Sequence, residues 1–293
     1  MTVDQLIAVT GATGGVGGRV ARRLSSEGAL VRMVVRDPRR APDLPGAELA
    51  RAEYADGEAM RSALEGAPTL LLVSGSEAVD RLDHHVSAVD AAVAAGVERI
   101  VYLSFLAAAP DATFTFARDH FGTEEHIRST GVSFTFLRDS LYADIVPYLV
   151  STDDLVIRGP AGNGRVAWVT RDDVADVAAA VLTGTSHEGA AYDVTGPEAL
   201  TMADTAQRLS EVVGREVVYH RETLEEARAS RAGYGAPPWE VEGWVTSYAA
   251  IATGELDVVS GTVANVAGHE PQRLDEFLER NPDTWGHLLA AGT

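Results

Sequence analysis

The sequence predicts an α/β protein in which a doubly wound parallel sheet is joined to a smaller C-terminal α/β lobe. Short, near-continuous apolar runs alternate with helical segments through the first 140 residues, a pattern typical of strands buried on both faces of a parallel sheet. A glycine-rich turn separates the first apolar run from the first helical segment. Beyond about residue 150 the alternation loosens, so a smaller and less regular lobe is expected there.

The elements of the first half follow one another along the chain as strand and helix. The expected strands are Leu6–Thr10, Leu30–Val35, Leu70–Val73, Arg99–Leu103 and Phe134–Leu137, and the expected helices are Val16–Glu27, Glu58–Leu64 and Asp80–Ala95. The last of these helices is followed by Gly96, a residue type that commonly ends a helix. Residues 1–150 are therefore predicted to form the sheet domain, with one strand returning near residues 190–195.

The second half, residues 151–293, is predicted to form the smaller lobe. Its expected elements are the helices Asp172–Leu182, Met202–Val213 and Leu274–Arg280 and the strand Ala191–Val194. Asp172 and Asp173 suit the positive N-terminal end of the first of these helices. Glycine and proline mark Gly159–Gly164 and Gly233–Trp239 as loops.

Composition excludes several classes of protein. The 43 acidic and 24 basic residues give a net charge of −19, which repels phosphate backbones and argues against nucleic-acid binding. No apolar run reaches the roughly 18 residues that span a bilayer, and residues 1–10 lack the features of a signal peptide, so a cytoplasmic protein without membrane contact is expected. There are no cysteines, hence no disulfides or thiol catalysis. The histidines show no ligand spacing, and no metal site is expected.

The segment TGATGGVG, which starts at Thr10, carries the clearest chemical signal in the chain. It follows a predicted strand and opens a predicted helix, as a dinucleotide-binding turn requires. Glycines let the backbone turn sharply and approach a pyrophosphate, and the helix N-terminus supplies free N–H groups. The turn predicts a Rossmann-type domain that binds a dinucleotide; a purely structural glycine-rich turn is the alternative. The expected pyrophosphate contacts are Gly11, Ala12, Thr13, Gly14, Gly15, Val16 and Gly17.

The residue at the end of the second strand selects the cofactor. An acidic residue there binds the ribose 2′-hydroxyl of NAD, whereas arginine suits the 2′-phosphate of NADP. This chain has Arg36, followed by Asp37, Arg39 and Arg40, which favours NADPH over NADH. Two alternatives stay open: Asp37 could serve a 2′-hydroxyl if the register shifts by one, or the segment is a solvated basic loop.

Several segments together resemble the NmrA-like atypical short-chain dehydrogenases, and within that group the type-2 NAD(P)H:quinone oxidoreductases. They are the glycine turn, VVRDPRR at the second strand end, and the segments Leu70–Glu77, Ala91–Phe105, Phe136–Ile145, Gly159–Leu182 and Tyr192–Thr201. The resemblance implies a Rossmann domain, a small C-terminal lobe that binds substrate, and a cleft between them. It further implies a small-molecule substrate and a monomer or homodimer.

The resemblance also assigns residues at the strand ends, where open α/β sheets bind ligands. Ser74 and Gly75 are expected beneath the ribose or nicotinamide, and Ser104 and Phe105 against the nicotinamide. Ser104 could instead be a strand-end cap. Two further residues, Tyr142 and Asp144, are expected to line the substrate pocket.

Ordinary short-chain dehydrogenases use a Tyr-x-x-x-Lys pair, and this chain has His120 and Glu124 in the corresponding stretch. On a helix the two share a face. His120 could line the cleft and bind or protonate substrate, with Ser104 as a second catalytic candidate; a helix-surface pair is the alternative. Hydride transfer to a quinone or similar electron-poor conjugated compound is compatible with the missing pair. So are a biosynthetic reductase with a dedicated substrate and a non-catalytic NADP sensor that binds a protein partner.

Overall fold

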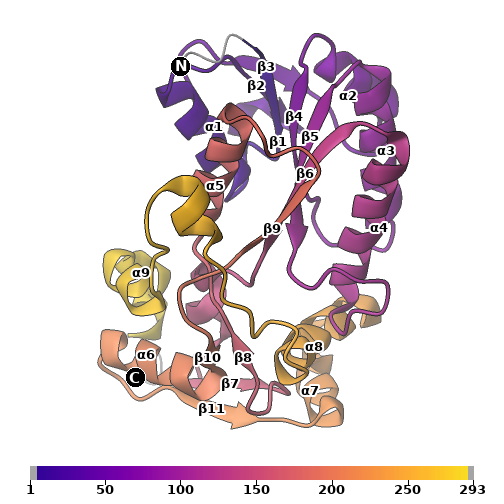
Figure 1. Cartoon of the computed structure of the whole chain (residues 1–293). Coiled ribbons are helices and arrows are strands. Elements are labelled where there is room, and N and C mark those ends of the chain that lie inside the picture. The colour runs from indigo at the N-terminus through magenta and orange to yellow at the C-terminus, as the bar shows by residue number, and fades with distance from the viewer. Residues whose placement is uncertain (1–4, 290–293) are drawn as a thin grey trace.

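The computed structural model describes residues 5–289, and a seven-stranded sheet dominates them (Figure 1). The strands lie in the order β3-β2-β1-β4-β5-β6-β9, and each neighbouring pair is parallel. The strand bounds are β1 Ile7–Thr10, β2 Val31–Val35, β3 Glu48–Arg51, β4 Thr69–Val73, β5 Arg99–Phe105, β6 Ser133–Asp139 and β9 Ala190–Val194. The strand order reverses between β1 and β4, so a ligand crevice is expected outside their carboxyl ends. The predicted Rossmann-type fold is confirmed.

Helices cover both faces of this sheet. They are α1 Gly17–Ser26 and α5 Arg171–Thr183 on one face, and α2 Gly57–Leu64, α3 Arg81–Ala94 and α4 Thr115–Thr130 on the other. Because successive side chains of a strand point to opposite faces, Ile7 and Val9 pack in the core with α1 and α5, while Ala8 packs in the core with α2 and α3. The strand is therefore apolar at every position, as the continuous apolar run predicts.

Within residues 5–289, a second lobe is built from two small sheets and four helices. Strand β7 Val156–Gly159 pairs in parallel with β11 Val218–Arg221, and β8 Arg165–Val166 pairs antiparallel with β10 Leu200–Thr201. The helices are α6 Met202–Val213, α7 Leu224–Arg231, α8 Pro238–Ala252 and α9 Leu274–Arg280. Trp168, Ile157 and Phe277 are buried in the core of this lobe, which continues to Phe105 of β5 and Ala117 of α4.

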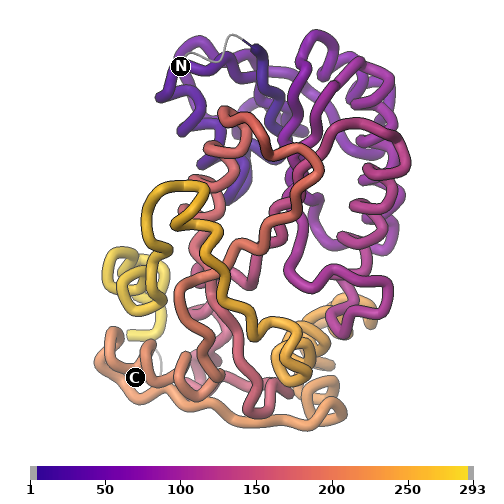
Figure 2. Tube along the Cα trace, in the orientation of Figure 1, coloured from indigo at the N-terminus to yellow at the C-terminus, as the bar shows by residue number. Residues whose placement is uncertain are grey.

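Short helical turns connect these elements. They are η1 Pro38–Arg40, η2 Ala143–Leu149, η3 Ala232–Tyr234, η4 Val263–Ala267, η5 Pro282–Thr284 and η6 Gly286–Leu288. The chain crosses between the two parts more than once: after β7 and β8 it returns through α5 and β9, and β9 lies beside β6 (Figure 2). The domain boundary at residue 150 stays a prediction.

Two local expectations are corrected. Strand β3 was not anticipated, because it is an edge strand with mostly exposed residues and forms no apolar run. The stretch Gly233–Trp239 is a loop only in part, since η3 overlaps its start and α8 begins at Pro238. Proline is well suited to the first turn of a helix, where its missing N–H costs no hydrogen bond.

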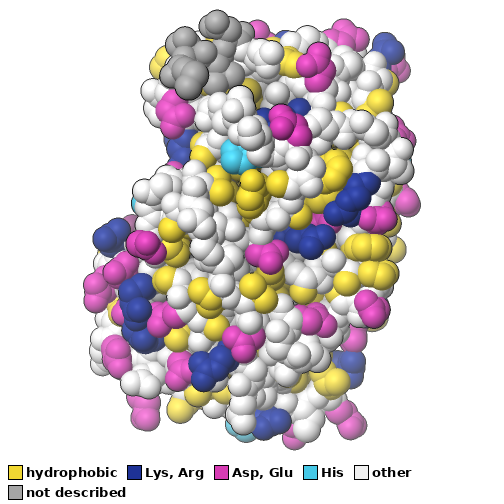
Figure 3. All heavy atoms as spheres, in the orientation of Figure 1, with side chains coloured by type: hydrophobic (Ala, Val, Ile, Leu, Met, Phe, Trp, Pro, Cys, Tyr) yellow, Lys and Arg dark blue, Asp and Glu magenta, His cyan; other side chains and the backbone are white. Residues whose placement is uncertain are grey.

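The surface of the protein carries many acidic side chains, as the net charge of −19 predicts. Acidic side chains are spread over both lobes on the face in Figure 3, and hydrophobic side chains gather mainly toward its middle. Within residues 5–289, no helix combines the length and apolar character needed to cross a membrane.

Candidate functional site

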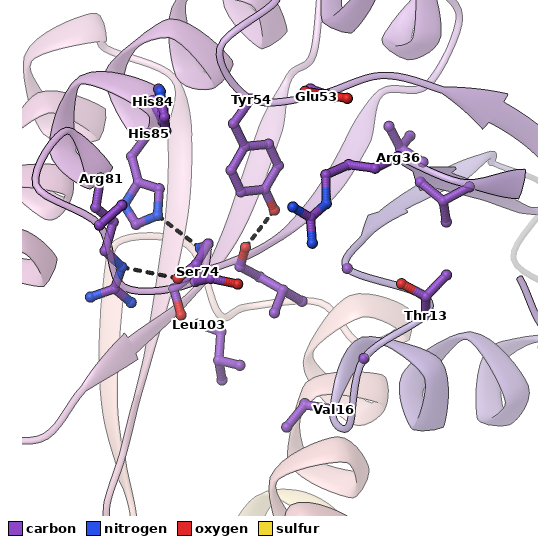
Figure 4. Close-up of a pocket in the computed structure, with 18 of the residues that line it drawn as sticks. Thr13, Val16, Arg36, Glu53, Tyr54, Ser74, Arg81, His84, His85 and Leu103 are labelled. Atoms are coloured by element: carbon purple, nitrogen blue, oxygen red, sulfur yellow. Dashed lines mark hydrogen bonds between the residues drawn. The ribbon is translucent and has the colours of Figure 1, made fainter. Parts of the chain in front are cut away.

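A pocket of about 540 Å³ lies outside the carboxyl ends of β1, β2 and β4. The glycine turn Gly11–Val16 forms one side, and Arg36 enters from the end of β2. Ser74 and Gly75 follow β4 on the other side (Figure 4). The pocket therefore spans the point where the strand order reverses, the position at which this architecture binds dinucleotides.

The turn before α1 is shaped so that only glycine fits at key positions. Gly11 has a φ of +62°, and its carbonyl oxygen accepts a 2.8 Å hydrogen bond from the Gly14 N–H. A Cβ on Gly17 would lie 2.5 Å from that same oxygen, and a Cβ on Gly14 would lie 3.1 Å from it. The backbone can thus turn tightly and direct the N-terminus of α1, with its unpaired N–H groups, toward the pocket. This cradle fits a pyrophosphate.

The basic segment after β2 divides into two parts. Arg36 lines the pocket and points into it (Figure 4). Asp37, in contrast, accepts hydrogen bonds from the Arg39 backbone N–H at 3.1 Å and from the Arg39 side chain at 2.9 Å. The Arg39 guanidinium holds the pKa of Asp37 below its usual range. The carboxylate of Asp37 is therefore engaged outside the pocket lining, which leaves Arg36 facing the cavity.

A second cation beside the glycine turn, Arg171, was missed in the sequence. It begins α5, and a Cβ on Gly15 would lie 2.7 Å from its Cδ. Its guanidinium stands 4.7 Å from the centre of the Tyr142 ring and forms a 3.0 Å ion pair with Asp144. Asp144 is buried and also lies 4.0 Å from Arg19. Asp144 therefore positions Arg171 and does not itself line the pocket, whereas Tyr142 does.

The loop after β4 is fixed on both sides of Gly75. Arg81, only 4% exposed, donates from Nε to the Gly75 carbonyl at 3.0 Å. The Gly75 N–H donates to His85 Nε2 at 2.9 Å, so the His85 proton sits on Nδ1, 2.8 Å from the Thr123 hydroxyl. Burial lowers the pKa of His85 to about 3. The imidazole is therefore neutral and acts as a hydrogen-bonded support for this loop.

His120 lies behind Arg81 and not at the helix surface. Arg81 Nη2 lies 3.1 Å from His120 Nε2, and because arginine only donates, this nitrogen must accept. The imidazole proton then sits on Nδ1, 3.0 Å from the Tyr102 hydroxyl. Burial, and then the charge of Arg81, lowers the pKa of His120 well below its ordinary value. His120 is a neutral acceptor for Arg81, and the interpretation of a surface pair with Glu124 is wrong, because both side chains are buried.

Ser104 and Glu124 belong to a buried cluster beneath the pocket. The Ser104 hydroxyl donates to Glu124 Oε1 at 2.7 Å, and Arg138 binds both oxygens of the same carboxylate at 2.8 and 2.6 Å. Ser104 is fully buried, so its side chain faces α4 and not the cavity. Phe105 is also buried and packs 5.1 Å from Phe114, ring centre to ring centre.

The structure thus separates the expected site residues into two groups. Those that line the pocket are Gly11, Thr13, Gly14, Gly15, Val16, Arg36, Ser74, Gly75 and Tyr142. Those that do not line it are Ala12, Gly17, Ser104, Phe105, His120 and Asp144. The pocket is also lined by four residues that were not expected from the sequence: Tyr54, Arg81, His85 and Arg171. Among residues 5–289, no group of three histidine, aspartate or glutamate side chains is arranged to hold a metal ion.

Comparison with known proteins extends these observations. The chain is 38% identical over 287 residues to a (4-alkanoyl-5-oxo-2,5-dihydrofuran-3-yl)methyl phosphate reductase of Streptomyces griseus, covering 96% of this chain and 99% of that protein. It is 33% identical over 281 residues to quinone oxidoreductase 2 of Escherichia coli, covering 93% and 97%.

Solved structures agree with this relationship. A crystal structure of an Escherichia coli NADPH-dependent quinone oxidoreductase in complex with NADPH superimposes with a TM-score of 0.86 at 31% identity, covering 94% of this chain and 99% of that one. The model of the NmrA-like family matches residues 3–278. The resemblance carried by the sequence motifs is confirmed, and this chain belongs to the NmrA-like family.

Proposed function

We propose that this chain is an NADPH-dependent oxidoreductase that reduces a small, electron-poor conjugated molecule such as a quinone. One observation carries the proposal: Arg36 faces the same pocket as the glycine cradle, while Asp37 is bound by Arg39. A free guanidinium at this position suits a 2′-phosphate, and a free carboxylate would suit a 2′-hydroxyl. The complex of the related quinone oxidoreductase with NADPH supports the same choice.

In this proposal, each side of the pocket binds a different part of the cofactor. Gly11–Val16 holds the pyrophosphate at the N-terminus of α1, with Arg171 as a neighbouring cation. Arg36 binds the 2′-phosphate at the end of β2. Ser74 and Gly75 pass beneath the ribose or nicotinamide, and Arg81 and His85 hold Gly75 in place through its backbone. NADPH, when bound, supplies a hydride.

The reaction does not call for the Tyr-x-x-x-Lys pair that this chain lacks. A hydride that reaches a quinone or a conjugated ketone leaves a delocalised oxyanion, which is more stable than an alkoxide and therefore depends less on acid catalysis. Positioning of the acceptor against the reducing ring then supplies much of the rate. The two curated relatives, a quinone oxidoreductase and a reductase of an unsaturated lactone, both carry names that fit acceptors of this kind.

The test is anaerobic oxidation of NADPH by the purified chain, without added flavin, against a panel of quinones, conjugated ketones and imines. The proposal expects NADPH-dependent reduction of at least one acceptor class. NADPH binding without turnover on any acceptor would contradict it and would favour the alternative, a non-catalytic NADP sensor with a protein partner.

A further inference from the structure

Tyr142 and Asp139 form a hydrogen-bonded pair at the wall of the pocket. Asp139 is the last residue of β6 and is 4% exposed. Tyr142 follows three residues later, lines the pocket, and directs its hydroxyl to the Asp139 carboxyl. The pair therefore joins a buried carboxyl to a phenol that borders the cavity.

The pair lies at the end of the pocket where chemistry is expected. Leu103 and Tyr142 come from the carboxyl ends of β5 and β6, beyond the switch point between β1 and β4. Arg36 lies on the other side of that point, at the end of β2. A dinucleotide whose 2′-phosphate is bound by Arg36 crosses the switch point and places its other half near Tyr142.

The carboxyl of Asp139 is held differently from that of the neighbouring Asp144. Arg171 pairs with Asp144 at 3.0 Å, and its guanidinium carbon lies over the Tyr142 ring, 4.7 Å from the ring centre. Asp139 is instead bound by the Tyr142 hydroxyl. A buried carboxyl without a close cationic partner favours its protonated form.

We propose that Tyr142 donates the proton that the reduced substrate requires, and that Asp139 controls when this proton is available. The inference rests on the proposed function and adds its proton donor. When Asp139 is ionised, the Tyr142 O–H donates a hydrogen bond to the carboxylate and is not available to the substrate. When Asp139 is protonated, its own O–H can donate to the Tyr142 oxygen, and the Tyr142 O–H is then free to turn to the substrate. Tyr142 is the catalytic residue in this account, and Asp139 is a positioning residue.

The proton balance is complete with the groups named. Hydride addition forms a C–H bond on a conjugated ketone or quinone and leaves the negative charge on its oxygen. The O–H bond of Tyr142 breaks and a new O–H bond forms on that oxygen. The proton of the Asp139 carboxyl moves to the Tyr142 oxygen, and water restores the proton on Asp139.

The surroundings set the pH at which the pair changes state. Burial raises the pKa of Asp139 to about 7, against the opposing effects of the Tyr142 hydrogen bond and of Arg171 and Arg81. Burial, with the charge of Asp139, raises the pKa of Tyr142 well above its ordinary value. The charged or titratable groups that face the pair are Arg171 from α5, Arg81 from α3 and Asp144 from η2. Turnover on an acceptor that needs a proton should therefore fall as the pH rises through about 7.

Two kinds of acceptor separate proton donation from hydride transfer. A conjugated ketone needs one hydride and one proton, whereas a triarylmethane cation becomes neutral on hydride addition alone. We expect Tyr142→Phe to slow ketone reduction at pH 6 by at least about tenfold, within the range of general acid catalysis. The same variant should change reduction of the cation by less than about twofold. Equal rates of ketone reduction in Tyr142→Phe and the unmodified chain would overturn the inference.

Asp139→Asn tests the switch, with Asp193→Asn as the matched control. Asp193 is a partly buried aspartate whose pKa burial also raises, and it lies outside the pocket lining. Infrared spectra of the chain without cofactor should contain a carboxylic acid band that titrates near pH 7, is lost in Asp139→Asn and persists in Asp193→Asn. The fall of ketone turnover above pH 7 should also disappear in Asp139→Asn alone.

A spectrum in which no carboxylic acid titrates near pH 7 would overturn the assignment of Asp139, whatever the activity. Absence of turnover on every acceptor would overturn both the proposed function and the catalytic role of Tyr142. Retained turnover with a pH profile unaffected by Asp139→Asn would overturn this inference alone.

Discussion

Asp37 and Arg39 bind each other at two points, with Arg39 Nε on Asp37 Oδ1 and Nη2 on Oδ2, both at 2.9 Å. This local pair supports one of the two interpretations of the segment after β2, in which Arg36 and not Asp37 faces the cofactor. The carboxylate that could have bound a ribose 2′-hydroxyl is already engaged with its neighbour. Arg36, one residue earlier, is the charged group of this segment that lines the pocket.

Arg36→Ala should therefore weaken NADPH binding more than NADH binding. A charge-assisted hydrogen bond is worth roughly 1.5–3 kcal/mol, so we expect the Kd for NADPH to rise about tenfold to a hundredfold. The Kd for NADH should change by less than about threefold. Calorimetric titration of both cofactors measures this, with Arg40→Ala, at an exposed position outside the pocket lining, as the control. An equal loss for both cofactors would contradict the assignment of Arg36.

Gly14→Val should abolish dinucleotide binding while the chain stays folded. A Cβ at this position would lie 3.1 Å from the Gly11 oxygen, so the turn must shift by a few tenths of an ångström, and the two methyl groups would occupy the phosphate cradle. We expect the free energy of unfolding to fall by less than about 2 kcal/mol. Gly57→Val is the control, because Gly57 begins α2 and its Cβ would meet only the Ser87 hydroxyl at 3.4 Å. Retained NADPH affinity in Gly14→Val would place the phosphates elsewhere.

His85→Gln should reduce the acid sensitivity of the fold. The pKa of His85 is lowered from 6.5 to about 3 in the folded chain, so the unfolded chain binds an extra proton as the pH falls below about 6.5, and folding loses stability there. At pH 5 this loss amounts to about 2 kcal/mol relative to neutral pH. Between pH 7 and pH 5, the unfolding free energy of the unmodified chain should therefore fall by about this amount more than that of His85→Gln. His220→Gln, at an exposed position, is the control, and an equal shift there would refute the explanation.

Much of the sheet and of the cofactor side of the pocket could be predicted from the sequence. Apolar runs such as Leu70–Val73 mark central strands because these strands are buried on both faces. The glycine turn could be predicted because its backbone leaves no room for a side chain at positions such as Gly17. The edge strand β3 could not be predicted, because most of its residues are exposed and it forms no apolar run. Tyr54, which follows β3 and lines the pocket, was therefore missed as well.

The buried residues of α4 could not be assigned from spacing alone. His120 and Glu124 are four residues apart on α4, yet each bonds to a different partner: His120 to Arg81 from α3, and Glu124 to Arg138 from β6. These contacts join α4 to other elements, so helical periodicity within α4 carries no information about them. Charged residues at helix starts just after a strand, such as Arg171, are the signal that could have been used.

An isotope label tests whether hydride passes directly from NADPH bound in this pocket to the substrate. The purified chain, with no flavin added, is given NADPH carrying deuterium at the transferred C4 position and a conjugated ketone, and the product is analysed by mass spectrometry. We expect one deuterium on the newly reduced carbon, and loss of the labelled product in Gly14→Val but not in Gly57→Val. NADPH oxidation that yields an unlabelled product would show that the hydride does not pass directly, and would contradict the account.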